Sequence, residues 1–233
     1  MSELRAERVV IGYDGPAIVQ EVSLIARSGV ITVILGANGA GKSTLAKGIV
    51  GLLPLMEGHV FKDGDEVTGM KPFSLVRHGV GYLPQLGNVF EDMTVLENLQ
   101  MGGYTQRAKL AERIERVLDL FPDLRDALRR NANELSGGQR RMVAMARCLV
   151  PVPEVLILDE PTAGLAPAYA ERVWQQVERV RDTGVALLVV EQSVNLAMKH
   201  ADHAVVLSNG RVSLEGPAQE IMKAEELAEL FVG

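Results

Sequence analysis

The chain contains a glycine-rich run that has the composition of a phosphate-binding loop. Residues 36–44 read GANGAGKST and directly follow the apolar run Ile31–Leu35. Glycines let the backbone curl until successive N–H groups point at one phosphate, and a helix that starts there adds its positive end. We predict that this run binds phosphate groups, with Lys42 on the outer phosphates and the Ser43 hydroxyl on Mg²⁺. The alternative is a purely structural glycine turn.

Two consecutive acids follow a second aliphatic run. Residues 155–160 read VLILDE, an aliphatic run that ends in two acids. Strands of an α/β sheet present ligand groups at their carboxyl ends. We expect Asp159 to hold Mg²⁺ through water. Glu160, one residue further, is the candidate general base for a water molecule that attacks a phosphate. The alternative is that both acids only cap the next helix.

A third run offers a second anion site without a lysine. Residues 135–141 read LSGGQRR and open the segment Met142–Leu149, which has a helical pattern. Ser136 and two glycines at a helix N-terminus can bind an anion, although an ordinary helix cap would use the same residues. Two phosphate-type sites for one nucleotide indicate a site shared between two subunits.

The composition restricts the function classes. The chain has 233 residues, 47% of them apolar, and a formal charge of −6, so a general nucleic-acid-binding surface is not expected. Cys148 is the only cysteine, which excludes an intrachain disulfide. The N-terminus lacks the apolar core of a signal peptide, and no aliphatic run has the ~20 residues that cross a bilayer. Membrane association would therefore require a partner.

Short apolar runs are expected to form the strands that position these groups. Most are apolar at consecutive residues, as in strands buried on both faces of a parallel sheet, so we expect an α/β core. The predicted strands are Arg8–Ile11, Val30–Leu35, Gly79–Leu83, Val155–Asp159, Ala186–Glu191 and Ala204–Leu207. Between Gln85 and Glu134 these runs stop and apolar residues recur at helical spacing, which predicts a helical insertion.

The runs together resemble a known family. GANGAGKST, Gln85 in GYLPQ, LSGGQRR and VLILDEP, in this order and spacing, resemble the nucleotide-binding subunit of an ABC transporter. The resemblance implies an α/β fold: a P-loop NTPase core with a parallel sheet, an N-terminal antiparallel β part and a helical subdomain. It implies a single domain over residues 1–233, with an ATP-binding core at 1–84 and 151–233 and a helical subdomain at about 85–150.

The resemblance also assigns roles residue by residue. In this family two subunits face head to tail, and each ATP lies between the phosphate loop of one subunit and the signature run of the other, which in this chain is LSGGQRR at residues 135–141. The nucleotide-binding residues are then Tyr13, Gly36, Asn38, Gly39, Ala40, Gly41, Lys42, Ser43, Thr44, Ser136, Gly137, Gly138 and Gln139. Those for Mg²⁺ are Ser43, Gln85 and Asp159, and the catalytic residues are Glu160, Gln192 and Gln85. Tyr13 would stack on adenine, with simple packing as the alternative.

Two departures from the family pattern concern the catalytic residues. The family usually has an Asp in the loop after the catalytic Glu, but residues 163–166 here read AGLA. It usually has a His where this chain has Gln192. An amide can donate a hydrogen bond to the γ phosphate region but cannot take up a proton. Glu160 is therefore the better candidate for the base.

Further similarities concern the subfamily. GLAP, VEQ and MTVLENLQMGG resemble the ATP-binding subunits of branched-chain amino-acid importers, and similar subunits serve urea and short-chain amide importers. The implied partners are integral membrane permease subunits and a second ATPase, a copy or a paralogue, with an external solute-binding protein only indirectly involved and no nucleic acid. The implied location is the cytoplasmic face of the membrane, through the permease. A soluble, non-transport ABC ATPase remains the alternative from another class.

One apolar pair lies in the loop after Gln85. Val89 and Phe90 precede the helical run MTVLENL. Exposed apolar groups in a loop often mark a partner site. Packing of both under the next helix is the alternative.

Overall fold

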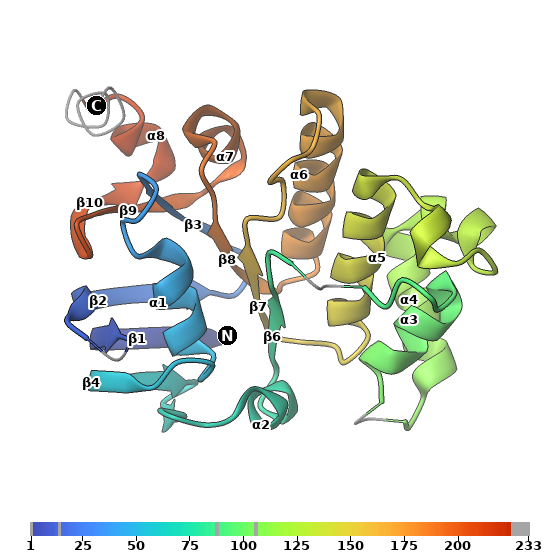
Figure 1. Cartoon of the computed structure of the whole chain (residues 1–233), viewed down its shortest axis with the longest axis horizontal. Coiled ribbons are helices and arrows are strands. Elements are labelled where there is room, and N and C mark those ends of the chain that lie inside the picture. The colour runs from blue at the N-terminus through green and yellow to red at the C-terminus, as the bar shows by residue number, and fades with distance from the viewer. Residues whose placement is uncertain (1, 14, 87–88, 105–106, 225–233) are drawn as a thin grey trace.

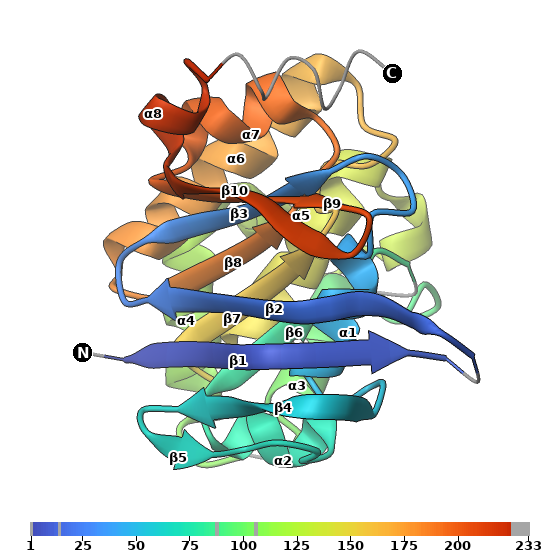
Figure 2. The same ribbon diagram turned by 90° about the vertical axis from the view of Figure 1, so that its left-hand side faces the viewer.

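The computed structural model describes residues 2–13, 15–86, 89–104 and 107–224. In this part of the chain the strands form two sheets (Figures 1 and 2). The antiparallel sheet has the order β2-β1-β4-β5, with β1 at Glu3–Gly12, β2 at Ala17–Arg27, β4 at Leu55–Lys62 and β5 at Asp65–Glu66. The second sheet has the order β10-β9-β3-β8-β7-β6, with β3 at Ile31–Gly36, β6 at Val80–Leu83, β7 at Val155–Asp159, β8 at Ala186–Val190, β9 at His203–Ser208 and β10 at Arg211–Pro217.

The central strands are buried on both faces, as their consecutive apolar residues predict. Strands β9, β3, β8, β7 and β6 run parallel, and β10 joins the edge antiparallel to β9. Alternate side chains enter two separate cores: Leu156 and Leu158 of β7 pack in one, and Val155 and Ile157 in the other. The period of two along a strand explains this division.

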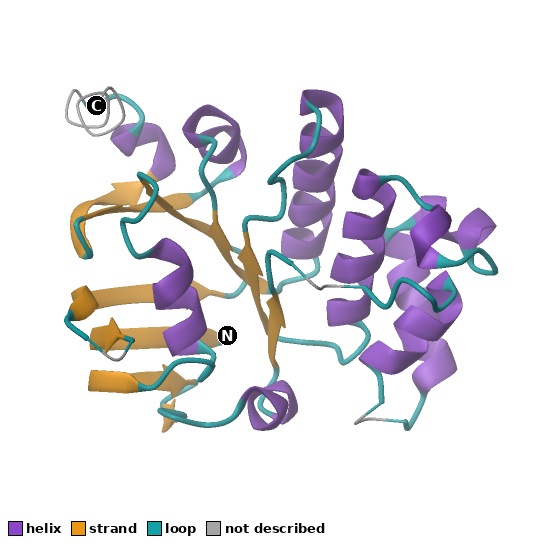
Figure 3. Ribbon diagram, viewed as in Figure 1, coloured by secondary structure: helices purple, strands orange, loops and turns teal. Residues whose placement is uncertain are grey.

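Helices cover both faces of this second sheet (Figure 3). Helix α1 lies between the two sheets, and α5, α6 and α7 pack on the opposite face. The α-helices are α1 (Lys42–Ile49), α2 (Pro72–Arg77), α3 (Val95–Gly102), α4 (Leu110–Leu120), α5 (Gly137–Leu149), α6 (Pro167–Asp182), α7 (Val194–His200) and α8 (Ala218–Ile221), and two 3₁₀ turns are η1 (Pro122–Ala127) and η2 (Ala132–Glu134). None of the helices in the described ranges is long and apolar enough to cross a membrane.

The predicted fold class is confirmed: an α/β core carries an antiparallel β part and a group of helices. Five of the predicted strands agree with the structure within one residue at each end, whereas the predicted Arg8–Ile11 covers only part of β1, which begins at Glu3. The strand prediction missed β2, β4 and β10, in which exposed residues recur between buried or half-buried ones and interrupt the apolar run, and the two-residue strand β5, which is exposed. The helical part follows β6 as expected, with α3, α4 and α5 before β7. The division into core and helical subdomain at about residues 85 and 150 stays a prediction.

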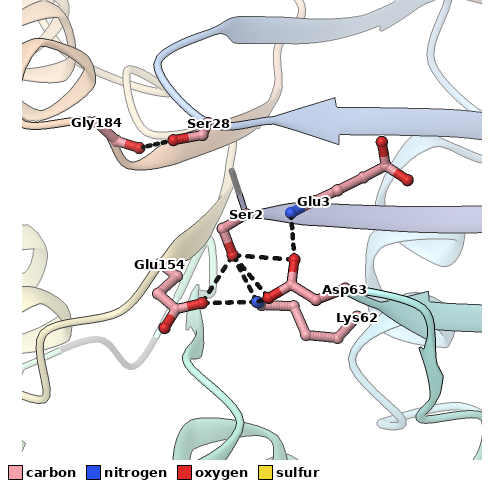
Figure 4. A network of polar contacts seen from close by, with 7 residues as sticks. All are labelled: Ser2, Glu3, Ser28, Lys62, Asp63, Glu154 and Gly184. Atoms are coloured by element: carbon pink, nitrogen blue, oxygen red, sulfur yellow. Dashed lines mark hydrogen bonds and ion pairs between the residues drawn. The ribbon is translucent and has the colours of Figure 1, made fainter.

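A polar cluster joins the two sheets at one end (Figure 4). The Lys62 side chain at the end of β4 is only 5% exposed, and its Nζ contacts Asp63, Glu154 Oε2 at 2.7 Å and Ser2 Oγ at 2.5 Å. Glu154 directly precedes β7, so the cluster links the antiparallel sheet to the second sheet. Ser28 Oγ donates to the Gly184 carbonyl at 2.6 Å nearby and adds a second link.

Candidate functional site

The glycine-rich run forms a cradle between β3 and α1. Gly39 and Gly41 have φ values of 83° and 97°, a region in which an L side chain is strained. A Cβ at Gly36 would lie 2.4 Å from the Leu207 carbonyl oxygen, so the close approach of β9 requires glycine there. The first N–H groups of α1 have no partner inside the helix and carry its positive end. These features suit an anion.

Lys42 lies at the base of this cradle. Its side chain is almost completely buried, and Nζ donates to the carbonyl oxygens of Gly36 at 2.8 Å and Ala37 at 3.0 Å. Burial lowers the pKa of Lys42, while the negative charges of Glu160, Asp159 and Glu191 oppose that change. The ammonium group therefore lies among carbonyls and carboxylates that compensate its burial.

Asp159 ends β7 beside the first turn of α1. Its Oδ1 accepts from Ser43 Oγ at 2.8 Å and its Oδ2 accepts from the Tyr82 hydroxyl at 3.2 Å. Burial raises the pKa of Asp159, and these two donors oppose the rise. A serine hydroxyl beside a carboxylate is a donor set that fits Mg²⁺, which usually takes one or two carboxylates together with substrate phosphates. Within the described residues no group of three His, Cys, Asp or Glu side chains could hold a metal by itself.

Glu160 leaves the strand in an unusual conformation. Its φ is +48°, and its N–H donates to the Val190 carbonyl at 2.9 Å. Two side-chain amides hold its carboxylate: Gln85 Nε2 donates to Oε2 at 2.6 Å and Gln192 Nε2 donates to Oε1 at 2.7 Å. The amide of Gln192 thus contacts the candidate base itself. The expected contact of Gln192 with the γ phosphate region stays a prediction.

Strand order explains why these groups meet. Gln85 follows β6, Glu160 follows β7 and Gln192 follows β8, and these three strands are parallel neighbours. The carboxyl ends of parallel strands lie along one edge of the sheet. Gln85 and Gln192 lie 75 and 32 positions from Glu160 along the chain, and the strand order brings both to its carboxylate.

A pocket of about 230 Å³ opens over the cradle. It is lined by Ile18, Asn38, Gly39, Gly41, Lys42, Ser43, Thr44 and Glu160. Sequence reasoning missed Ile18, because β2 was not among the predicted strands. Phosphate ligands at the cradle and the Glu160 carboxylate would share this pocket. The arrangement suits the transfer of a phosphoryl group to water.

The signature run lies elsewhere in the molecule. Ser136 caps α5 in a capping box, in which its Oγ accepts from Gln139 N and Gln139 Oε1 accepts from Ser136 N. Ser136, Gly138 and Gln139 line a different pocket together with Tyr169. Within one chain the structure therefore does not bring this run to the phosphate cradle. Tyr13 also lies outside the lining of the cradle pocket and is 55% exposed.

Three polar residues near Glu160 were missed by sequence reasoning. Tyr82 donates to Asp159, and Thr162 and Glu191 bond to each other behind the Glu160 turn. All three had a detectable signal, since each lies within three residues of a predicted site residue that follows a strand: Tyr82 of Gln85, Thr162 of Glu160 and Glu191 of Gln192.

Comparisons with known proteins are consistent with this geometry. Residues 19–163 match the family described as "ABC transporter". The chain is 41% identical over 232 residues to a probable branched-chain amino acid transport ATP-binding protein LivF of Archaeoglobus fulgidus, covering 99% of this chain and 98% of the relative. It is 31% identical to the lipopolysaccharide export system ATP-binding protein LptB of Escherichia coli K12, over 100% of this chain and 98% of the relative.

A solved structure has the same fold throughout. The ADP conformation of MJ1267, an ATP-binding cassette of an ABC transporter, superposes with a TM-score of 0.92 at 29% identity, covering 100% of this chain and 99% of that chain. The two sheets and the helical part described above are therefore the arrangement of a nucleotide-binding cassette.

Proposed function

Because this chain belongs to the ABC transporter family, we propose that its ATPase powers the import of branched-chain amino acids across the cytoplasmic membrane. The chain is an ABC transporter ATPase subunit related to branched-chain amino acid transport proteins. The observation that carries the proposed substrate is the 41% identity to LivF over almost the whole of both chains. The direction of transport and the amino-acid class belong to the proposal.

The catalytic roles follow from the contacts at the cradle. Lys42 and the N-terminal N–H groups of α1 would bind the phosphates of ATP. Ser43, Asp159 and Gln85 would hold Mg²⁺, which neutralises charge on the β and γ phosphates when bound. Glu160 accepts the proton of the attacking water as general base. Gln85 and Gln192 orient the Glu160 carboxylate, because each donates one hydrogen bond to it.

The second nucleotide contact would come from another subunit. Ser136, Gly137 and Gly138 lie at the N-terminus of α5, away from the cradle of their own chain. A head-to-tail pair, with a second copy or a paralogue, would bring this helix end to the γ phosphate of its partner. Tyr13 would stack on adenine, since its ring is exposed and free of the core.

A permease would dock where the helical part meets the sheet. Phe90 is 44% exposed, and the Arg147 guanidinium lies 4.9 Å from its ring centroid. Arg147 also borders a mainly apolar pocket of about 230 Å³, whose lining includes Phe73, Met101 and Cys148. Such a surface suits the apolar face of a short amphipathic helix. This contact would hold the subunit at the cytoplasmic face of the membrane.

The structure separates the two residues of the apolar loop pair. Val89 packs against the larger core, whereas the Phe90 ring is partly exposed. The backbone of Phe90 is held by the buried Asn98, whose Oδ1 accepts from Phe90 N at 2.8 Å and whose Nδ2 donates to Phe90 O at 3.0 Å. A Phe90→Ser change is therefore expected to leave the loop and the ATP site intact.

We expect Phe90→Ser to weaken assembly with the permease at least severalfold while the melting temperature stays within about 2 °C. Pull-down with the co-expressed permease, ATP binding and thermal melting are the measurements. Leu52→Ser is a matched control, because Leu52 is 50% exposed and lies outside the lining of this pocket. Normal assembly and uptake would contradict the docking site, and loss of folding would favour the packing alternative.

The transported solute is tested in proteoliposomes. The complete transporter is reconstituted with this subunit inside the vesicle and the solute-binding protein outside. Leucine, isoleucine or valine is expected to accumulate inside the vesicle only when ATP is also enclosed there. Accumulation of urea or a short-chain amide instead would replace the amino-acid assignment. ATP-driven extraction of a lipid would place the chain with LptB-like exporters. A subunit that co-purifies with no permease would favour a non-transport ATPase.

A further inference from the structure

A buried carboxylate lies beside Gln192, one of the two residues whose amides hold Glu160. Glu191 follows β8 and is 2% exposed. Its Oε1 accepts from Thr162 Oγ1 at 2.6 Å and from Thr162 N at 3.2 Å, and its Oε2 accepts from Gln192 N at 3.1 Å. The side chain thus connects the turn after Glu160 with the residue whose amide reaches Glu160.

The environment of Glu191 suits this connecting role. Burial and the negative charge of Glu160 raise the pKa of Glu191, while the hydrogen bonds from Thr162 and Gln192 oppose the rise. Lys42 and Arg141 both interact with its charge, so the buried carboxylate has compensating cations. Arg141 Nη1 also donates to the Gln85 carbonyl at 3.2 Å. A buried carboxylate with three donors and two nearby cations is fixed in one orientation, because any other would leave donors unpaired.

The bond to Gln192 N fixes the backbone that carries the Gln192 side chain. A side-chain bond to the next backbone N–H restricts the dihedrals between the two residues. Gln192 Nε2 lies 2.7 Å from Glu160 Oε1, and a small change in the direction of the Gln192 side chain would lengthen that hydrogen bond. Residues 163–166, which follow the Glu160 turn, read AGLA and contain no Asp. The hydroxyl of Thr162, bonded to Glu191, is the side-chain link between the Glu160 turn and the loop that carries Gln192.

We propose that Glu191 is a positioning residue for ATP hydrolysis, which holds the Gln192 amide on the Glu160 carboxylate through its bonds to Thr162 and Gln192 N. This inference rests on the proposed role of Glu160 as general base. Glu191 does not touch the nucleotide in this scheme and acts only through Gln192.

Glu191→Gln tests the proposal with little change in shape. In either amide orientation, an NH₂ group replaces an oxygen that now accepts a hydrogen bond, so at least one donor bond is lost. The kcat for ATP is expected to fall roughly three- to tenfold, the range for one lost hydrogen bond, with KM changed less than about twofold. Glu215→Gln is the matched control, because Glu215 is an exposed residue of β10 far from β8 in sheet order.

A double-mutant cycle with Gln192→Ala separates positioning from general damage. If Glu191 acts through Gln192, Glu191→Gln should change kcat less than about twofold once the Gln192 amide is absent. If the fold-losses of kcat from the two substitutions multiply in full, Glu191 does not act through Gln192 and the proposal is overturned. If Glu191 were only structural, Glu191→Gln would lower the melting temperature, and its loss of kcat would again multiply with that of Gln192→Ala.

Thr162→Val provides a second route if Glu191→Gln does not fold. It removes the 2.6 Å hydroxyl bond and retains the backbone bond, so a smaller loss of kcat is expected, again absent in the Gln192→Ala background. Thr162→Ser restores the hydroxyl and should recover most of that loss. Full activity of Glu160→Gln would overturn the proposed chemistry itself. If Glu160→Gln and Gln192→Ala lose ATPase activity while Glu191→Gln keeps full activity, only the inference about Glu191 is overturned.

Discussion

At the residue scale, the central feature is a carboxylate with both oxygens occupied. Gln85 and Gln192 donate to opposite oxygens of Glu160, and the positive φ of Glu160 turns its side chain out of the strand direction. Strained backbone at a strand end often serves a positioned catalytic group. At position 192, where the resemblance leads us to expect His, Gln supplies a hydrogen-bond donor to Glu160 but cannot itself take up a proton.

Gln192→Ala is expected to lower kcat roughly tenfold, because one charge-assisted hydrogen bond to Glu160 is lost. KM for ATP should change less than about twofold, since Gln192 does not line the cradle pocket. Steady-state ATPase kinetics measure both values. Gln20→Ala, at a β2 residue that bonds to Arg211, is the control. A large rise in KM with unchanged kcat would contradict the assigned contact.

Cys148 is expected to react slowly with alkylating agents. Burial raises the pKa of its thiol to about 11, and its Sγ lies 3.5 Å from the Tyr82 carbonyl. The proton therefore stays on sulfur until the pH approaches that value, so at pH 8 the reactive thiolate is roughly a hundredfold scarcer than for a free thiol. Intact-mass analysis after iodoacetamide treatment, native against urea-unfolded, measures this. Equal rates in both states would contradict the burial effect.

At the element scale, each motif is placed by the end of a strand or helix. Gln85, Glu160 and Gln192 follow β6, β7 and β8 at one edge of the sheet, and residues 37–41 of the cradle connect the end of β3 to the start of α1. The capping box of α5 instead places the signature residues on the helical side. The antiparallel sheet contributes packing, because it lies over α1 and closes the second core.

Lys62→Met is expected to lower the free energy of unfolding by about 1–2 kcal/mol, because it leaves Asp63 and Glu154 without their shared cation. The value is modest because both carboxylates are about half-exposed and water screens them. ATP affinity should not change. Denaturant unfolding measures the loss. Lys199→Met, whose pair with Glu171 is on the surface, should cost less than about 1 kcal/mol.

The pH dependence of this difference has a defined sign. The hydrogen bond from Lys62 lowers the pKa of Glu154. A carboxyl group whose folded pKa is depressed stabilises the fold above its unfolded pKa, and that contribution is lost as the pH falls through the folded value. The gap between wild type and Lys62→Met should therefore be full at pH 7 and shrink below about pH 4. A gap that grows in acid would contradict the ion-pair account.

At the scale of the whole molecule, the cradle and the signature run lie in separate places on one chain. Helices α1 and α5 lie on opposite faces of the second sheet, in different cores. The cradle and the signature run therefore line different pockets. This separation is the reason for the proposed head-to-tail pair, in which each run would face the other subunit.

Glu160→Gln is expected to bind ATP, to lose turnover at least a hundredfold and to accumulate an ATP-bound dimer, because the γ phosphate is held while water activation is lost. Size-exclusion chromatography with Mg-ATP measures the dimer, with Mg-ADP as the control nucleotide. A paralogous partner is indicated if the dimer forms only when that partner is added. An active variant would remove Glu160 from its assigned role.

The sequence by itself determined the chemistry that depends on neighbouring residues. The cradle over residues 36–44 and the capped start of α5 are local structures, so a few adjacent residue types are enough to predict them. The α/β class was also predictable, because double-faced burial leaves consecutive apolar residues in the central strands. The half-exposed strands β2, β4 and β10 lack that pattern and were missed.

The tertiary structure decided which distant groups meet. Gln85 and Gln192 lie on either side of Glu160 only because β6, β7 and β8 are parallel neighbours in the sheet. The bond between Thr162 and Glu191 depends on the same strand order. Strand order is decided by long-range packing of two cores, and no spacing within the sequence encodes it directly.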